Sequence, residues 1–134
     1  MKILGIEHIG IALEKREKTS SFLKDVLELE NGKIELVKEQ KVLTEIYDTG
    51  KGKLELLEKS EPDSPISRFL KKRGDGVHHI ALEVDNLDEW LKNLKQKNVQ
   101  LIDSKPRIGA ENYRIAFIHP KATGGILVEL CQKS

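Results

Sequence analysis

The sequence predicts an α+β domain made of two similar halves, each with a strand, a helix and three further strands. One observation is a repeat: residues 7–13 read E-H-I-G-I-A-L and residues 78–84 read H-H-I-A-L-E-V, and each places a histidine before an alternating apolar strand. The other two observations are an amphipathic helix after the first strand of each half and a set of strand-like segments after each of these helices. We expect one domain over 1–134, with module one at 1–60, a linking helix at 61–75 and module two at 76–134.

Three helices are predicted from apolar periodicity and capping residues. Residues 15–28 carry apolar side chains on one helical face. Residues 87–97 carry a similar stripe behind Asn86, with Glu89 placed as in a capping box. Between the halves, a short linking helix is bracketed by residues suited to its two ends, namely Ser64 at the N-cap, Pro65 in the first turn and Gly74 after the last turn.

Strand-like segments follow the first and the last of these helices. Gly50 and Gly52 mark a hairpin turn between the last two strands of the first half. Each half therefore has the order β-α-β-β-β. After the first strand of each half, we expect strands at roughly 33–38, 41–48 and 52–58, and at roughly 99–103, 113–118 and 125–131.

Composition excludes several classes of protein. With 23 basic and 22 acidic residues, the net charge is +1, which argues against nucleic acid or a membrane surface as a partner. No apolar run approaches the ~20 residues of a membrane span, and the first residues lack the pattern of a secretory signal. The single cysteine, Cys131, is expected to pack as a small apolar residue in a reducing compartment. We therefore expect a cytoplasmic protein.

A histidine and a glutamate recur in equivalent strands of the two halves. His8 and His79 lie in the first strands, and Glu55 and Glu129 stand between aliphatic residues in the last strands. All four point away from the main aliphatic stripe of their strands. Imidazole and carboxylate groups that converge would suit a divalent cation with open positions. Read alone, each histidine also fits a hydrogen-bonded core residue and each glutamate a solvated strand face, so the pattern leaves both interpretations open.

Six segments over residues 3–132 resemble the vicinal-oxygen-chelate (glyoxalase) superfamily and, within it, the methylmalonyl-CoA epimerase family. They read I-E-H-I-G-I-A, K-L-E-L-L-E, D-S-P-I-S-R-F-L, G-V-H-H-I-A-L-E-V, F-I-H-P-K-A-T-G-G and I-L-V-E-L. The histidines and glutamates indicate the superfamily, and the D-S-P-I and H-P-K-x-x-G-G segments favour the epimerases. The resemblance implies paired βαβββ modules in a curled mixed sheet around a metal cleft, a homodimer and an acyl-CoA substrate.

The resemblance also implies roles for particular residues. It implies two-base 1,1-proton transfer at C2 of methylmalonyl-CoA, through a metal-stabilised enolate, with Glu45 and Glu129 as the acid–base pair. His119 and Lys121, in the H-P-K segment, are candidate substrate contacts. Cobalt is the expected metal, with manganese, nickel or zinc also compatible. The implied metal ligands are His8, Glu55, His79 and Glu129.

Other interpretations remain open at this point. A glyoxalase I uses the same ligand types on a glutathione hemithioacetal, an extradiol dioxygenase needs only three of them, and the same fold serves in metal-free ligand-binding proteins. Glu55 stands where some epimerases have glutamine, and the loop 109–113 departs from the family pattern. A basic cluster either meets CoA phosphates or complements the dipole of its own helix, and comprises Arg68, Lys71, Lys72 and Arg73.

Overall fold

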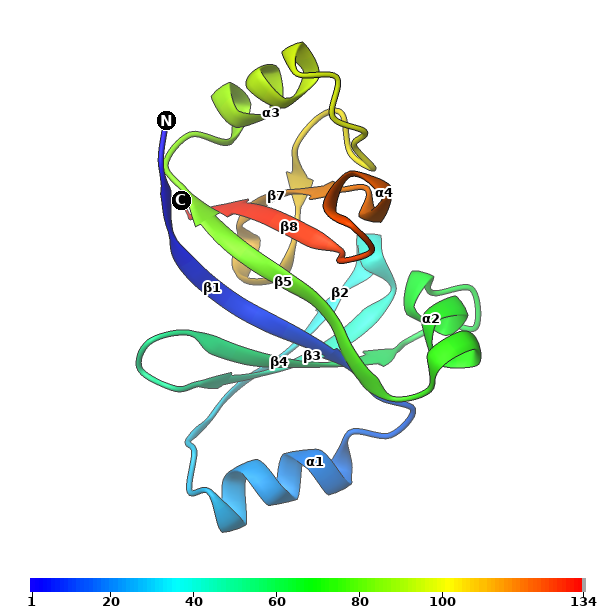
Figure 1. Ribbon diagram of the computed structural model, residues 1–134. Coiled ribbons are helices and arrows are strands. Elements are labelled where there is room, and N and C mark those ends of the chain that lie inside the picture. The colour runs from blue at the N-terminus through cyan, green and yellow to red at the C-terminus, as the bar shows by residue number, and fades with distance from the viewer. Residues whose placement is uncertain (134) are drawn as a thin grey trace. The chain divides into compact units, whose positions relative to one another are not determined.

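The structure is a computed structural model that describes residues 1–133, apart from the side chain of Asn31 (Figure 1). The chain divides into two compact units: one is His8–His78, and the other comprises Met1–Glu7 and the residues from His79 onward. The expected β-α-β-β-β order is present in both halves of the chain. Among the described residues, no helix has the length and apolar character needed to cross a membrane.

The unit His8–His78 contains a mixed sheet with the strand order β2-β3-β4-β1. Strand β1 pairs in parallel with β4, and the other neighbours are antiparallel. The predicted caps of the linking helix α2 are confirmed, because Ser64 is its N-cap and Gly74 its C-cap. The elements are β1 (Ile3–Ala12, which enters this unit at His8), α1 (Glu17–Ser21), η1 (Phe22–Val26), β2 (Asn31–Val37), η2 (Lys38–Gln40), β3 (Val42–Asp48), β4 (Lys53–Lys59) and α2 (Pro65–Arg73).

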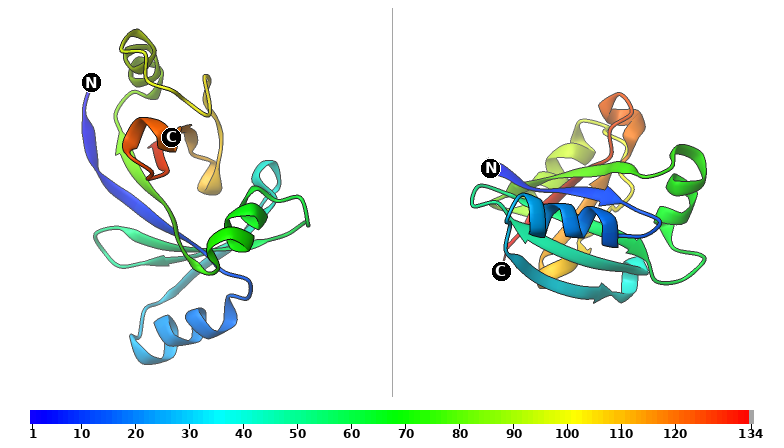
Figure 2. Two further views of the ribbon diagram at one scale, coloured as in Figure 1. Left: turned by 45° about the vertical axis from the view of Figure 1, so that its right-hand side comes forward. Right: turned by 90° about the horizontal axis from the view of Figure 1, so that it is seen from below.

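Helix α1 and its continuation η1 cover one face of this sheet (Figure 2). The apolar core on that face consists of Leu13, Leu23, Tyr47 and Leu56. A hydrogen bond of 2.5 Å between the hydroxyls of Ser20 and Tyr47 joins α1 to β3. Side chains alternate between the two faces along β1 and β4. The residues next to the core residues on these strands therefore point to the opposite face of the sheet.

The second unit repeats this arrangement with the strand order β5-β8-β7-β6. Strands β5 and β8 are parallel, as β1 and β4 are. Helix α3 covers a core made by Val84, Leu87, Leu91, Ala116 and Leu130. Its predicted cap is confirmed, since Asn86 Oδ1 accepts the Glu89 N–H at 3.1 Å. The elements are β5 (Gly76–Val84, which enters this unit at His79), α3 (Leu87–Gln96), β6 (Arg107–Ile108), η3 (Ala110–Asn112), β7 (Arg114–Ile118), α4 (Pro120–Thr123) and β8 (Val128–Gln132).

The strand predicted at 99–103 does not form, apart from a single bridge at Leu101. The N–H groups of Ile102 and Asp103 both donate to the carbonyl of Phe117, at 2.9 and 3.2 Å, instead of alternating along a ladder. A carboxylate oxygen of Asp103 then accepts the Phe117 N–H at 2.8 Å. This side chain takes the place of a backbone acceptor, so regular pairing stops there. The short helix α4 was also not predicted.

Candidate functional site

The first histidine–glutamate pair lies on the face of its sheet opposite α1. In the parallel register of β1 and β4, Gly10 is the partner of Glu55, and His8 lies two residues earlier on the same face. Because Gly10 has no side chain, the imidazole of His8 can reach the carboxylate. Nδ1 of His8 lies 3.1 Å from Oε2 of Glu55, and both side chains are buried.

The second pair repeats this geometry in the other unit. Ala81 of β5 is the partner of Glu129 of β8, and His79 lies two residues before Ala81. Nε2 of His79 lies 3.3 Å from Oε1 of Glu129, and both side chains are again buried. The ring of Phe117 packs edge-on against the imidazole, with centroids 5.5 Å apart at 84°. The histidine and the glutamate that each half supplies therefore lie next to each other in both halves.

Each pair offers a nitrogen and an oxygen donor that suit a divalent transition metal. A carboxylate with 3–4% of its surface exposed, as in Glu55 and Glu129, is costly unless a positive charge or hydrogen bonds compensate it. A dication shared with a neutral imidazole meets that requirement. The donor chemistry and burial of both pairs therefore fit metal ligation.

Glu45 was expected to act as the second acid–base residue, and the structure places it on the other face of its sheet. In β3 it is the register partner of Leu56, which belongs to the core beneath α1. Glu55 is the next residue along β4 and points the opposite way. The carboxylate of Glu45 is 2% exposed and accepts a hydrogen bond from Arg16 Nη1 at 3.3 Å. Glu45 thus lies beneath a helix, on the face of the sheet opposite His8 and Glu55.

Arg16, which sequence reasoning missed, anchors this side of the unit. Its backbone N–H donates to Oε2 of Glu58 at 3.2 Å, and its Nε lies 3.8 Å from the same oxygen. Together with the bond to Glu45, these contacts tie the start of α1 to β3 and β4. The residue lies in the charged run E-K-R-E-K, which is typical of a solvated surface, so no local signal indicates the contacts.

His119 and Lys121, the candidate substrate contacts, lie at the start of α4. His119 is the N-cap, and its Nδ1 accepts the backbone N–H of Lys121 at 3.1 Å. Since Nδ1 acts as an acceptor, the neutral ring carries its hydrogen on Nε2, which becomes a donor. The side chain of Lys121 is exposed.

A further buried carboxylate, Glu7, directly precedes the first histidine and was also missed. Nζ of Lys133 lies 3.2 Å from a carboxylate oxygen of Glu7 and 3.6 Å from one of Glu83, and it stands 5.8 Å from the ring centre of Tyr113. Burial lowers the pKa of Lys133, but the hydrogen bond to Glu7 and the surrounding negative charge outweigh it and raise that pKa overall. The ammonium group thus compensates a buried negative charge.

The thiol of Cys131 is fully buried and packs with Ile115 and Phe117, as expected for a small apolar residue. Burial, followed by the negative charge of Glu129 and other nearby carboxylates, raises its pKa well above the ordinary range. His78 is also accounted for, because its ring packs edge-on against Phe69 of α2 at 5.0 Å. The thiol of Cys131 therefore lacks the exposure and the lowered pKa of a reactive nucleophile.

Comparison with known proteins gives consistent matches over nearly the whole chain. A sequence profile described as the Glyoxalase/Bleomycin resistance protein/Dioxygenase superfamily matches residues 7–117. The uncharacterized protein YqjC of Bacillus subtilis is 46% identical over 95% of this chain and 91% of its own length. The mitochondrial methylmalonyl-CoA epimerase of Mus musculus is 37% identical over 98% of this chain and 74% of its own length. A solved methylmalonyl-CoA epimerase in complex with methylmalonyl-CoA and NH4+ is 33% identical, covers 99% of this chain and 96% of its own, and has a TM-score of 0.92.

These matches confirm the expected fold class, the glyoxalase fold of paired βαβββ modules. The chain belongs to the glyoxalase superfamily and, within it, to the family that contains the methylmalonyl-CoA epimerases.

Proposed function

We propose that this protein interconverts (2R)- and (2S)-methylmalonyl-CoA with the help of one divalent metal ion. The observation that carries the proposal is the buried histidine–glutamate pair, which recurs at equivalent positions of the two halves. The family match supports the substrate, because relatives of 32–38% identity bear the epimerase name and one structural relative is a complex with methylmalonyl-CoA. The proposed metal ligands are His8, Glu55, His79 and Glu129.

Epimerisation removes the proton from C2, between the thioester and the carboxylate, and returns a proton to the opposite face. Negative charge develops on the thioester oxygen as the proton leaves. When bound, the metal ion supplies positive charge where that oxygen becomes anionic. The chain itself must bind the acyl group, keep water out and provide two proton carriers.

With Glu45 beneath α1, the carboxylates that lie directly against the two histidines are Glu129 and Glu55. We propose that Glu129 exchanges a proton with one face of C2. For the opposite face we propose Glu55, its equivalent in the other half, as the proton carrier of this chain; epimerases with glutamine at this position must use another group there. A carboxylate has two oxygens, so ligation through one leaves the other able to carry a proton. Their burial keeps water from competing for the transferred proton.

Incubation with each methylmalonyl-CoA epimer in heavy water, with and without chelator, tests the activity. We expect deuterium at C2 and inversion of configuration, both lost with chelator and restored by added metal. Retention of protium at C2 with both epimers would contradict the proposal. Turnover of a glutathione hemithioacetal in its place would indicate a glyoxalase I, and tight binding of a small molecule without turnover would indicate a ligand-binding protein.

Conservative variants test the two proton carriers separately. Glu129→Gln and Glu55→Gln keep an oxygen donor but cannot accept the C2 proton. We expect each variant to lose epimerisation by at least about 100-fold. Each should still exchange the C2 proton of one epimer with solvent, without inversion, and the two variants should favour opposite epimers. Equal loss of exchange from both epimers in both variants would contradict the assignment of one carboxylate to each face.

Metal stoichiometry tests the shared ligand set. We expect one ion per chain by elemental analysis, and loss of that ion in both His8→Ala and His79→Ala. Two ions per chain, each lost in only one of these variants, would show that the pairs bind metal separately.

The proposal also includes cobalt as the metal, a homodimer and a cytoplasmic location. Exposed apolar side chains on β1 support an assembled state, namely Ile3, Leu4 and Ile6. Activity after reconstitution with cobalt, manganese, nickel or zinc, and the mass in solution by light scattering, test the first two points. Fractionation of the source cells tests the third.

A further inference from the structure

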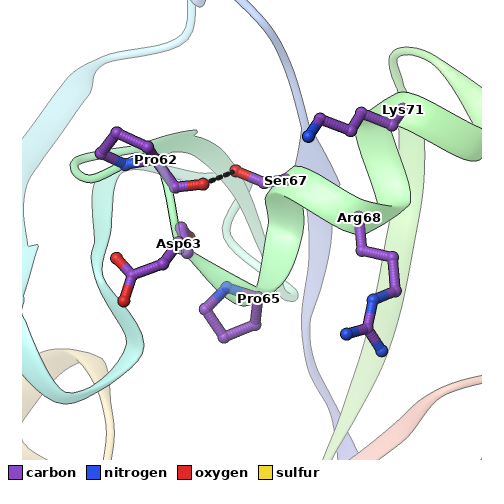
Figure 3. A pocket seen from close by; sticks show the side chains of 7 residues that line it. Pro62, Asp63, Pro65, Ser67, Arg68 and Lys71 are labelled. Carbon is purple, nitrogen blue, oxygen red and sulfur yellow. Dashed lines mark hydrogen bonds between the residues drawn. The ribbon is translucent and has the colours of Figure 1, made fainter.

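A groove of about 630 Å³ opens at the start of α2, outside the ligand pairs described above. It lies between the first turns of the helix and the loop that leads in from β4. Figure 3 shows Arg68 and Lys71 extending from the helix, with Pro62 and Asp63 across from them. The groove residues therefore come directly after β4, the strand that carries Glu55, in the chain.

The charges around this groove favour an anion. Arg68 and Lys71 are three residues apart, on one side of α2, and both are exposed. The carboxylate of Asp63 also lines the groove, but Lys41 donates a hydrogen bond to it and lowers its pKa. Because Lys41 offsets this negative charge, Arg68 and Lys71 set the sign of the groove. The positive end of the α2 dipole adds to it.

A second, independent feature of the groove is the hydroxyl of Ser64. This N-cap residue lines the groove and is 3% exposed, and its side chain makes no capping bond. Among the described residues, its Oγ has no hydrogen-bond partner. The neighbouring Ser67 differs, since its Oγ donates to the carbonyl of Pro62 at 3.0 Å (Figure 3). A buried hydroxyl without a partner is unfavourable, and a ligand oxygen at this helix start would satisfy it.

We propose that this groove binds a phosphate group of the nucleotide end of coenzyme A, through Arg68, Lys71 and the Ser64 hydroxyl. This inference rests on the proposed function, because it assigns the part of the acyl-CoA substrate that the ligand pairs do not hold. The groove is far larger than a carboxylate needs. Guanidinium and ammonium groups bind phosphate oxygens strongly, and the acyl end of the substrate offers no phosphate.

Two substrates and matched variants test the proposal. Methylmalonyl-CoA carries the nucleotide, whereas the methylmalonyl thioester of pantetheine has the same reacting atoms and no phosphate. In Arg68→Ala and Lys71→Ala we expect KM for the CoA substrate to rise about tenfold, with kcat little changed. Kinetics with the pantetheine thioester should match those of the unmodified protein. Lys72→Ala, on the same helix but outside the groove, serves as the control and should change neither substrate.

Unchanged KM for the CoA substrate in both groove variants would overturn the proposal. An equal loss with both substrates would also overturn it, because the groove would then serve the acyl end. Calorimetric titration with adenosine 3′,5′-bisphosphate tests the groove independently of turnover. Binding that weakens about tenfold in the groove variants supports a phosphate site even if the protein epimerises neither thioester, and no binding to the unmodified protein contradicts it.

Discussion

The replacement Glu45→Gln distinguishes the structure-based assignment from the one implied by family resemblance. If the carboxylate of Glu45 is catalytic, its replacement by an amide should make the variant inactive. A carboxylate buried beneath α1 and paired with Arg16 would instead make the variant less stable but still active. The amide keeps the size of the side chain and removes only its charge, so these two outcomes can be separated.

The size of the effect follows from the partners of Arg16. Breaking a fully buried ion pair costs about 3–5 kcal/mol. The side chain of Arg16 is 22% exposed and keeps its contact with Glu58 at 3.8 Å, so the cost here should be smaller. We expect the free energy of unfolding to fall by about 1–3 kcal/mol. For a domain of this size, that corresponds to a fall in Tm of about 4–12 °C.

Thermal unfolding and steady-state kinetics at 25 °C measure the two quantities on the same preparation. We expect kcat/KM within about threefold of the unmodified protein, a barrier change of about 0.7 kcal/mol or less. Glu58→Gln is the structural control, because it removes the other partner of Arg16 and should lower Tm by a smaller amount. If the turnover rate instead fell about 100-fold or more while Tm stayed the same, the reasoning would be refuted and Glu45 would return to the catalytic machinery.

Three further predictions follow from individual contacts. The backbone N–H of Lys2 donates to Asp85 and, with the N-terminal charge nearby, lowers the pKa of that carboxyl. Its stabilising effect is therefore present above the unfolded pKa of about 3.9 and lost as pH falls through the lower folded value. Asp85→Asn should accordingly be less stable than the unmodified protein at pH 7 but not at about pH 2, as acid unfolding curves can show. The Cys131 thiol, buried and with a raised pKa, should react with a thiol reagent at pH 8 only after denaturation, and rapid labelling of the native protein would contradict this. Asn86→Ala removes the side-chain cap of α3 and should cost about 1 kcal/mol in urea unfolding, whereas Asn86→Asp should cost much less.

The sequence predicts which histidine and which glutamate each half supplies, because both positions depend on strand periodicity. Alternation in β1 and β5 sets the face on which His8 and His79 lie, and the same rule in β4 and β8 sets the face of the glutamates. Parallel pairing of first and last strands then brings each histidine to its glutamate. The faces follow from element type and alternation, which the repeat indicates, whereas the parallel pairing is given by the structure.

Other features depend on register or on distant contacts, which a single sequence does not specify. Glu45 and Thr44 are neighbours in β3, and only the pairing of this strand with β4 determines which of them shares a face with Glu55. Thr44 is that residue, because its register partner Leu57 lies two residues from Glu55 on β4. A shift of one position therefore exchanges a buried hydroxyl for a carboxylate on the face that carries Glu55.

Each of the two histidines, His8 and His79, is the first residue after the point where a strand passes from one unit into the other. Strand β1 makes this passage between Glu7 and His8, and β5 between His78 and His79. A protease cut in the linker around α2 would consequently not release two self-sufficient fragments, because the C-terminal piece would lack the first seven residues of its own fold. Such a piece should regain structure when a synthetic peptide of residues 1–7 is added, because that segment belongs to the same compact unit.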